Sequence, residues 1–232
     1  MKRKENMPYT NFMAYVFFIG MLLFLFLLSQ NITRHMSHLF MKLFHSQSVA
    51  IYLLSFLFLP GVVLHELSHL LIANILFVPT GEVEFFPEIH GDSVKMGSVA
   101  IARTDPFRRF VIGVAPLVGG LGAMFVAASY LGEKIVSWQG LLLLYILFEI
   151  ANTMFSSKKD MEGALGFGIA AVVVGIILFF FRIPVLHLSW VFLEMPSVAA
   201  TFSRMDIFLA LAVGIDTVGL LLLLVIDAVG GR

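Results

Sequence analysis

The 232-residue chain is more apolar than a soluble domain, with 59% hydrophobic and only 13% charged residues. Soluble domains are about half apolar and a quarter charged, so this composition and the mean hydropathy of +0.97 predict a membrane protein. The net charge is zero, which gives no reason to expect nucleic acid as a partner. The lack of cysteine excludes disulfides, thiolate nucleophiles and thiolate metal ligands.

Apolar segments long enough to cross a bilayer alternate with short polar segments along the chain. Residues 31–48 interrupt this pattern with Arg34 and three histidines, and they are predicted to form an amphipathic helix at the membrane interface. The fold class we expect is an all-α polytopic membrane protein, forming a single domain over residues 1–232. About six transmembrane helices are predicted, near residues 12–29, 49–78, 107–131, 135–155, 163–181 and 206–227.

Residues 80–103, after the second predicted span, have a different pattern. Polar and apolar residues alternate from Glu82, His90-Gly91-Asp92 has the composition of a turn, and Val99 and Ile101 are two residues apart. Alternation on both sides of a turn predicts a small β-hairpin.

The distribution of lysine and arginine predicts the orientation in the membrane, because cytoplasmic loops are enriched in them. With six spans and a cytoplasmic N-terminus, ten such residues would be cytoplasmic and five would lie on the opposite side. This predicts a multi-pass protein of the cell membrane with the hairpin in the cytoplasm. The cytoplasmic set is Lys2, Arg3, Lys4, Lys95, Arg103, Arg108, Arg109, Lys158, Lys159 and Arg232, and the opposite set is Arg34, Lys42, Lys134, Arg182 and Arg204.

The second predicted span contains His65-Glu66-Leu-Ser-His69. In a helix the two histidines are one turn apart on the same face, where two imidazoles can take two of the four tetrahedral positions of Zn²⁺. Glu66 lies beside them, where a carboxylate can act as general base on a water that the metal acidifies. Ionisable residues inside a membrane are costly and usually functional. Five residues before His65, Pro60-Gly61 predicts a break in the helix.

A catalytic zinc site usually has three protein ligands and one open position. The acids within or beside the predicted spans after His69 are the candidates for the third ligand: Glu149, Asp160, Glu162 and Asp216. The residue types alone leave the choice open. Each of these acids has an alternative role, as an interhelical hydrogen-bonding group or as a charge at a helix start.

Together these residues resemble the site-2 protease family of membrane zinc metalloproteases. In that family His-Glu-x-x-His lies on one membrane helix, and a distant Asp follows an Asn by eight residues, as Asp160 follows Asn152 here. The resemblance covers about residues 61–163. It implies that His65, His69 and Asp160 bind zinc, that Glu66 is the catalytic base, and that Asn152 contacts the substrate backbone. The chain departs from the family pattern at Phe155, at Lys158-Lys159 and at Met161-Glu162.

The function expected from this resemblance is a zinc-dependent endopeptidase that cleaves a membrane-associated or membrane-spanning protein within or beside the bilayer. Its partners would be that protein or peptide substrate and the lipid bilayer. Two alternatives stay open: a membrane metalloprotease of the CAAX prenyl protease type, with Glu149 as third ligand, and a non-enzymatic transporter or scaffold with buried histidines and acids. The sequence indicates neither the substrate nor the oligomeric state.

Overall fold

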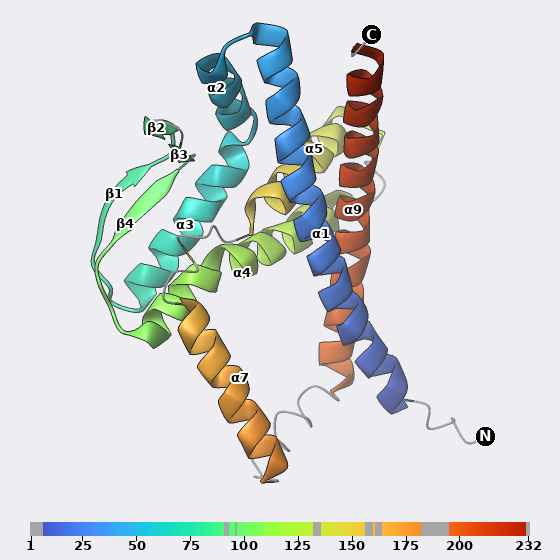
Figure 1. Ribbon diagram of the computed structural model, residues 1–232. Coiled ribbons are helices and arrows are strands. Elements are labelled where there is room, and N and C mark those ends of the chain that lie inside the picture. The colour runs from blue at the N-terminus through green and yellow to red at the C-terminus, as the bar shows by residue number, and fades with distance from the viewer. Residues whose placement is uncertain are drawn as a thin grey trace, which may run out of the picture.

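The computed structural model describes residues 7–90, 93–95, 97–131, 136–155, 160, 164–181 and 195–230. The chain is mainly helical, as predicted, and its elements are arranged as in Figure 1. The helices are α1 (Met7–Phe44), α2 (Gln47–Leu57), α3 (Leu59–Ile75), α4 (Pro106–Leu131), α5 (Trp138–Thr153), α7 (Ala164–Phe180) and α9 (Pro196–Gly230). The strands are β1 (Thr80–Glu84), β2 (Glu88–His90), β3 (Ser93–Lys95) and β4 (Ser98–Ile101).

The long helices α1 and α9 lie side by side and run in the same direction (Figure 1). Near the start of both helices, the rings of Phe18 and Phe202 pack edge to face with centroids 4.9 Å apart. Near the end of both, His35 Nδ1 lies 3.3 Å from Asp227 Oδ2. Between these two contacts, α1 and α9 share an apolar core with α4 and α5 that includes the fully buried Leu25 and Leu147.

The prediction of a separate interfacial helix at residues 31–48 is wrong, because α1 continues without a break from the apolar segment to Phe44. Neither Pro nor Gly occurs between Gly20 and Phe44 to end the helix. Asn31 stays within the helix by donating its side-chain amide to the carbonyl of Leu27 at 2.8 Å. The polar end of α1 is also held by the contact of His35 with α9. α9 likewise begins at Pro196, ten residues before the predicted start of the last span.

The structure supports membrane-spanning helices but not the predicted count of six. Three helices in the described residues are long and apolar enough to cross a bilayer, at Met13–Phe44, Pro106–Ala127 and Ala200–Val229. A fourth crossing is possible if α2 and α3, bent by 69° at their junction, are taken as one span. α5 and α7, at 16 and 17 residues, are shorter than the ~20 residues that usually span the hydrocarbon core.

The parallel direction of α1 and α9 also contradicts the predicted path of the chain. In a six-span path the first and last spans run in opposite directions, and both ends of the chain lie on one side. If α1 and α9 both cross the bilayer, as their length and hydropathy indicate, the end of α9 lies opposite the start of α1. The predicted path, which has both ends of the chain on the cytoplasmic side, therefore does not fit the direction of α9.

The break predicted at Pro60-Gly61 is confirmed, and it falls at Phe58, between α2 and α3. Pro60 sits in the first turn of α3, where the missing N–H costs no helical hydrogen bond. Gly61 then lies directly against α5, because a Cβ at that position would be 2.7 Å from the carbonyl oxygen of Glu149 and would also overlap the Thr153 side chain. The glycine therefore sets how closely α3 and α5 approach.

Replacing Gly61 by Ala should destabilise the protein by about 1–3 kcal/mol, because the added methyl group overpacks a tight contact with backbone on its far side. Thermal unfolding of the purified protein in detergent measures this effect. Gly122→Ala is the matched control, since Gly122 is also helical and a Cβ there meets nothing within 4 Å. Equal unfolding temperatures for the two variants would contradict the close approach of α3 and α5.

The predicted β-hairpin is confirmed. β1 pairs antiparallel with β4, with Val83 opposite Val99, and β2 pairs antiparallel with β3, with Ile89 opposite Val94. The predicted turn residues Gly91 and Asp92 lie outside the described residues. The hairpin lies alongside α3 (Figure 1).

α4 begins at Pro106, one residue before the predicted third span. The carboxylate of Asp105 accepts a hydrogen bond from the backbone N–H of Arg108 at 3.0 Å, and Pro106 is the first helical residue. This N-cap fixes where the chain turns from β4 into α4, and α4 then packs against α3 and α5.

Candidate metal centre

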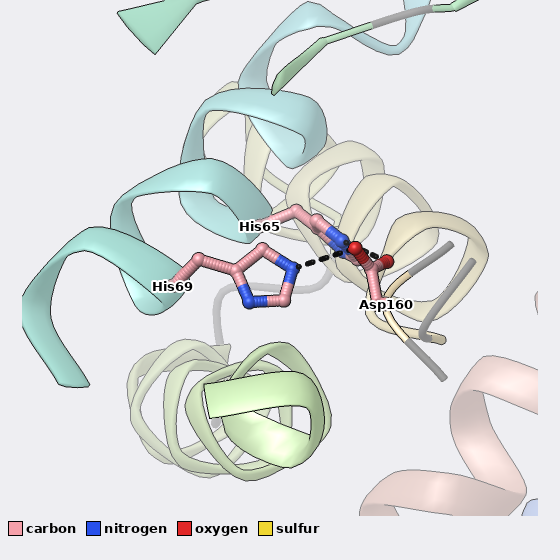
Figure 2. A group of neighbouring side chains, drawn as sticks. All are labelled: His65, His69 and Asp160. Atoms are coloured by element: carbon pink, nitrogen blue, oxygen red, sulfur yellow. Dashed lines mark ion pairs between the residues drawn. The ribbon is translucent and has the colours of Figure 1, made fainter. Parts of the chain in front are cut away.

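Three side chains that are distant in sequence converge between α3 and the segment that joins α5 to α7. His65 and His69 project from successive turns of α3, and Asp160 approaches both of them from the opposite side (Figure 2). His65 Nε2 lies 3.5 Å from Asp160 Oδ2, and His69 Nε2 lies 3.4 Å from Asp160 Oδ1. The three residues offer ligand atoms that all lie within 4.8 Å of one another.

These distances suit a tetrahedral metal ion. Zinc bonds to nitrogen and oxygen of about 2.0–2.2 Å imply separations of about 3.3–3.6 Å between neighbouring ligand atoms. Both histidine-to-aspartate separations fall in that range. Two imidazoles and one carboxylate form a known ligand set for catalytic zinc, which leaves the fourth position open.

Each imidazole is oriented by a hydrogen bond from its other nitrogen. His65 Nδ1 lies 2.6 Å from the carbonyl oxygen of Thr153, and His69 Nδ1 lies 2.8 Å from that of Ile112. A carbonyl can only accept, so Nδ1 carries a proton in both rings, and the neutral form of each ring presents a bare Nε2. This is the arrangement that usually fixes the ring of a metal-binding histidine.

His69 Nε2 is the ligand atom whose surroundings best fit a bound cation. The residue is only 4% exposed, and Nε2 makes no hydrogen bond in the described part of the chain. Its 3.4 Å contact with the Asp160 carboxylate is an ion pair only when the ring is protonated, and a buried polar atom without a hydrogen bond is destabilising. A cation bound by Nε2 and the Asp160 carboxylate would give this buried nitrogen a ligand bond.

Glu66 follows His65 directly, and it is buried with 7% of its surface exposed. The backbone of the hairpin lies against it, since a Cβ on Gly97 would be 3.1 Å from Glu66 Oε1 and 2.7 Å from a methyl group of Val62. Gly97 therefore allows the hairpin to cover the carboxylate closely.

An open cleft of about 540 Å³ leads to this group. Both His69 and Asp160 line it, together with residues of β1, β4 and the start of α4: Thr80, Gly81, Val99, Ala100, Ile101, Arg109, Ile112 and Gly113. The cleft therefore extends from the hairpin and the start of α4 to His69 and Asp160. The sequence did not indicate that Arg109 or Thr80 would share a cleft with the ligands.

The other candidates for the third ligand lie apart from the group. Glu149 is fully buried in α5, and neither of its carboxylate oxygens makes a hydrogen bond among the described residues. Asp216 of α9 accepts a hydrogen bond from Asn152 instead. Glu162 lies outside the described residues. Of the described candidates, only Asp160 meets the two histidines.

The predicted substrate contact of Asn152 is not tested by the structure. Its side-chain amide donates to the carbonyl of Phe148 at 2.9 Å and to Asp216 Oδ1 at 3.0 Å, and the Ser29 hydroxyl donates to its backbone carbonyl. These contacts join α5 to α9 and α1. Asn152 does not line the cleft described above, although the adjacent Thr153 orients His65.

Sequence reasoning did not predict the two carbonyl oxygens that orient the histidines. Backbone groups carry no sequence signal of their own. For His65, the position of Thr153 near the end of an apolar segment was a signal, because the last carbonyls of a helix have no helical partner and can accept from a side chain.

Comparison with family models, curated proteins and solved structures finds no match for this chain. The likeness to the site-2 protease family therefore rests on the motif residues and on their spacing.

Proposed function

We propose that the protein is a membrane-embedded zinc endopeptidase that cleaves a membrane-associated or membrane-spanning protein within or beside the bilayer. The observation that carries the proposal is the convergence of Asp160 on the two histidines of His-Glu-x-x-His. A chance match to a short motif gives no reason for a carboxylate 91 residues from His69 and 95 residues from His65 to reach both imidazoles.

His65, His69 and Asp160 would hold the zinc, and the bound ion would supply a Lewis acid that acidifies water and polarises a carbonyl. Glu66 would act as general base, taking the proton of the attacking water as it adds to the scissile carbonyl carbon. It would then give that proton to the leaving amide nitrogen, so that the peptide C–N bond breaks and a carboxylic acid and an amine result. Its burial beneath Gly97 limits competition from bulk water for that proton.

An extended substrate would bind in the cleft between the hairpin and α4. Among the described strands, β1 and β4 pair only with each other, so each retains one edge without a partner strand. A substrate strand could add to such an edge through its backbone hydrogen bonds. Val99 and Ile101 of β4 line the cleft and provide apolar contacts for substrate side chains.

The prenyl-protease-like alternative would use Glu149 as the third ligand, and the positions of Glu149 and Asp160 favour the endopeptidase instead. The proposal is tested by comparing the membrane proteomes of cells that carry the native protein or Glu66→Gln. We expect at least one membrane protein to accumulate uncleaved in the variant. If no cleavage product differs between the two proteomes, the proposal fails and the transporter or scaffold alternative is favoured.

We further propose that the segment before α1 is cytoplasmic, because Lys2, Arg3 and Lys4 precede the first span. Since α1 and α9 run in the same direction, α9 would then end on the opposite side. The cytoplasmic location predicted for the hairpin stays a prediction.

Cysteine labelling tests this topology, because the native chain has no cysteine to interfere. With an impermeant maleimide, Lys4→Cys should react only from the cytoplasmic side and Arg232→Cys only from the other. Ser93→Cys, in β3, then reports the side of the hairpin. Labelling of positions 4 and 232 from the same side would contradict the parallel arrangement of α1 and α9.

A further inference from the structure

α4 contains a proline one turn after the residue whose carbonyl contacts His69. Pro116 lies inside α4, four residues after Ile112. In an α-helix the carbonyl of Ile112 would accept a hydrogen bond from the N–H of residue 116. Proline has no N–H, so this carbonyl lacks its helical donor. The same carbonyl oxygen lies 2.8 Å from His69 Nδ1.

We propose that Pro116 is a positioning residue of the metal site. By removing the competing N–H, it leaves the Ile112 carbonyl free to accept the Nδ1–H of His69, and this bond keeps His69 Nε2 bare and directed at Asp160. The inference rests on the metal site of the proposed function, and it concerns a residue that touches neither the ion nor the substrate.

The packing of α4 against α3 supports this role. Ile112, Pro116 and Gly119 have the spacing i, i+4, i+7, so they lie along one face of α4. A Cβ on Gly119 would overlap the Ser68 side chain, which shows that this face lies directly against α3, next to His69. Pro116 itself is among the fully buried side chains. The freed carbonyl is therefore fixed close to the ring that uses it.

The surroundings of His69 offer its ring few other acceptors in place of the Ile112 carbonyl. His69 is 4% exposed and its ring lies at the contact between two helices, where little water is available as an alternative acceptor. The ring of His65 donates to a different kind of acceptor. Its partner is the carbonyl of Thr153, the last residue of α5, and a carbonyl at a helix end has no helical donor. Inside the 26-residue α4, only the proline provides a free carbonyl at this turn.

Pro116→Ala tests the inference, because alanine restores the N–H while keeping the helix. We expect zinc to bind about 10–100-fold more weakly, the range found when a group that orients a metal ligand is lost. Competition with a chelator of known affinity measures this change. In the metal-free variant, the ¹⁵N shifts of the His69 ring should move from the Nδ1–H tautomer toward the Nε2–H tautomer, a change that a purely structural proline would not cause.

Pro196→Ala is the matched control, because Pro196 is the first residue of α9, where an N–H would have no helical acceptor to recover. It should leave zinc affinity and the His69 tautomer unchanged. A folded Pro116→Ala protein with native zinc affinity and native tautomer would overturn the inference.

If Pro116→Ala does not fold, the inference is tested by the ¹⁵N shifts of the His69 ring in the native protein. The His69 signal is assigned by its loss in His69→Gln. An Nε2–H tautomer in the native metal-free protein would also overturn the inference, and an Nδ1–H tautomer would support it. Failure of the native protein to bind zinc would instead refute the proposed function, and the tautomer measurement would still test Pro116.

Discussion

Glu66→Gln should bind zinc as the native protein does and cleave its substrate about 10²–10⁴-fold more slowly, the usual cost of losing a general base. The amide nearly matches the carboxylate in size, so the packing against Gly97 and Val62 is retained. It cannot accept the proton of the attacking water. Metal binding is spared because Glu66 is not one of the three residues that converge as ligands.

The measurement is the initial rate of cleavage of the substrate found in the proteome comparison, with enzyme and substrate together in lipid vesicles. Glu82→Gln provides the control, since it makes the same change on an exposed residue of β1. An unchanged rate in Glu66→Gln would mean that another group takes the proton, and the mechanism would be wrong. Loss of zinc from this variant would mean that Glu66 is a ligand.

Removal of any one of His65, His69 and Asp160 should remove the zinc. Each supplies one of three ligand atoms within 4.8 Å, so the loss in affinity should exceed the roughly 10–100-fold that follows from changing a residue that only orients a ligand. Alanine variants at these positions, purified by the same procedure, should contain almost no zinc by elemental analysis. The native protein should contain about one ion per chain.

Two controls make this experiment specific. His35→Ala removes a histidine that also lies near an aspartate, Asp227, but at the end of α1, and it should keep its zinc. Glu149→Ala removes the acid that the prenyl-protease-like alternative would use, and it should also keep its zinc. If Glu149→Ala loses the metal while Asp160→Ala keeps it, the ligand assignment is wrong and that alternative is favoured.

The metal centre was more predictable from sequence than the path of the chain through the membrane. His65 and His69 lie one helical turn apart, so their convergence follows from local helix geometry, and the structure has them on one face. Asp160 was favoured by its spacing from Asn152, and it does meet the histidines. The hairpin could also be predicted from local sequence, because alternating residues and turn residues determine a hairpin over a few neighbouring positions.

The path of the chain through the membrane depends on tertiary contacts, which cannot be predicted from local sequence patterns. The polar residues of α1 after Ser29 read as a separate interfacial segment, yet contact with α9 through His35 and Asp227 supports one continuous helix. The direction of α9 relative to α1 is likewise set by packing, as between Phe18 and Phe202. The count of lysine and arginine residues assumed six crossings, and an even number of crossings does not fit the parallel direction of α1 and α9.

X-ray absorption at the zinc edge of the purified native protein tests the central claim most directly. We expect about one zinc per chain, bound by two imidazole nitrogens and at least one carboxylate oxygen at about 2.0–2.2 Å. The imidazole signal should fall in His65→Ala and His69→Ala loaded with excess zinc. A protein that holds no zinc, or one whose zinc shows no imidazole ligands, would contradict the proposed metal site.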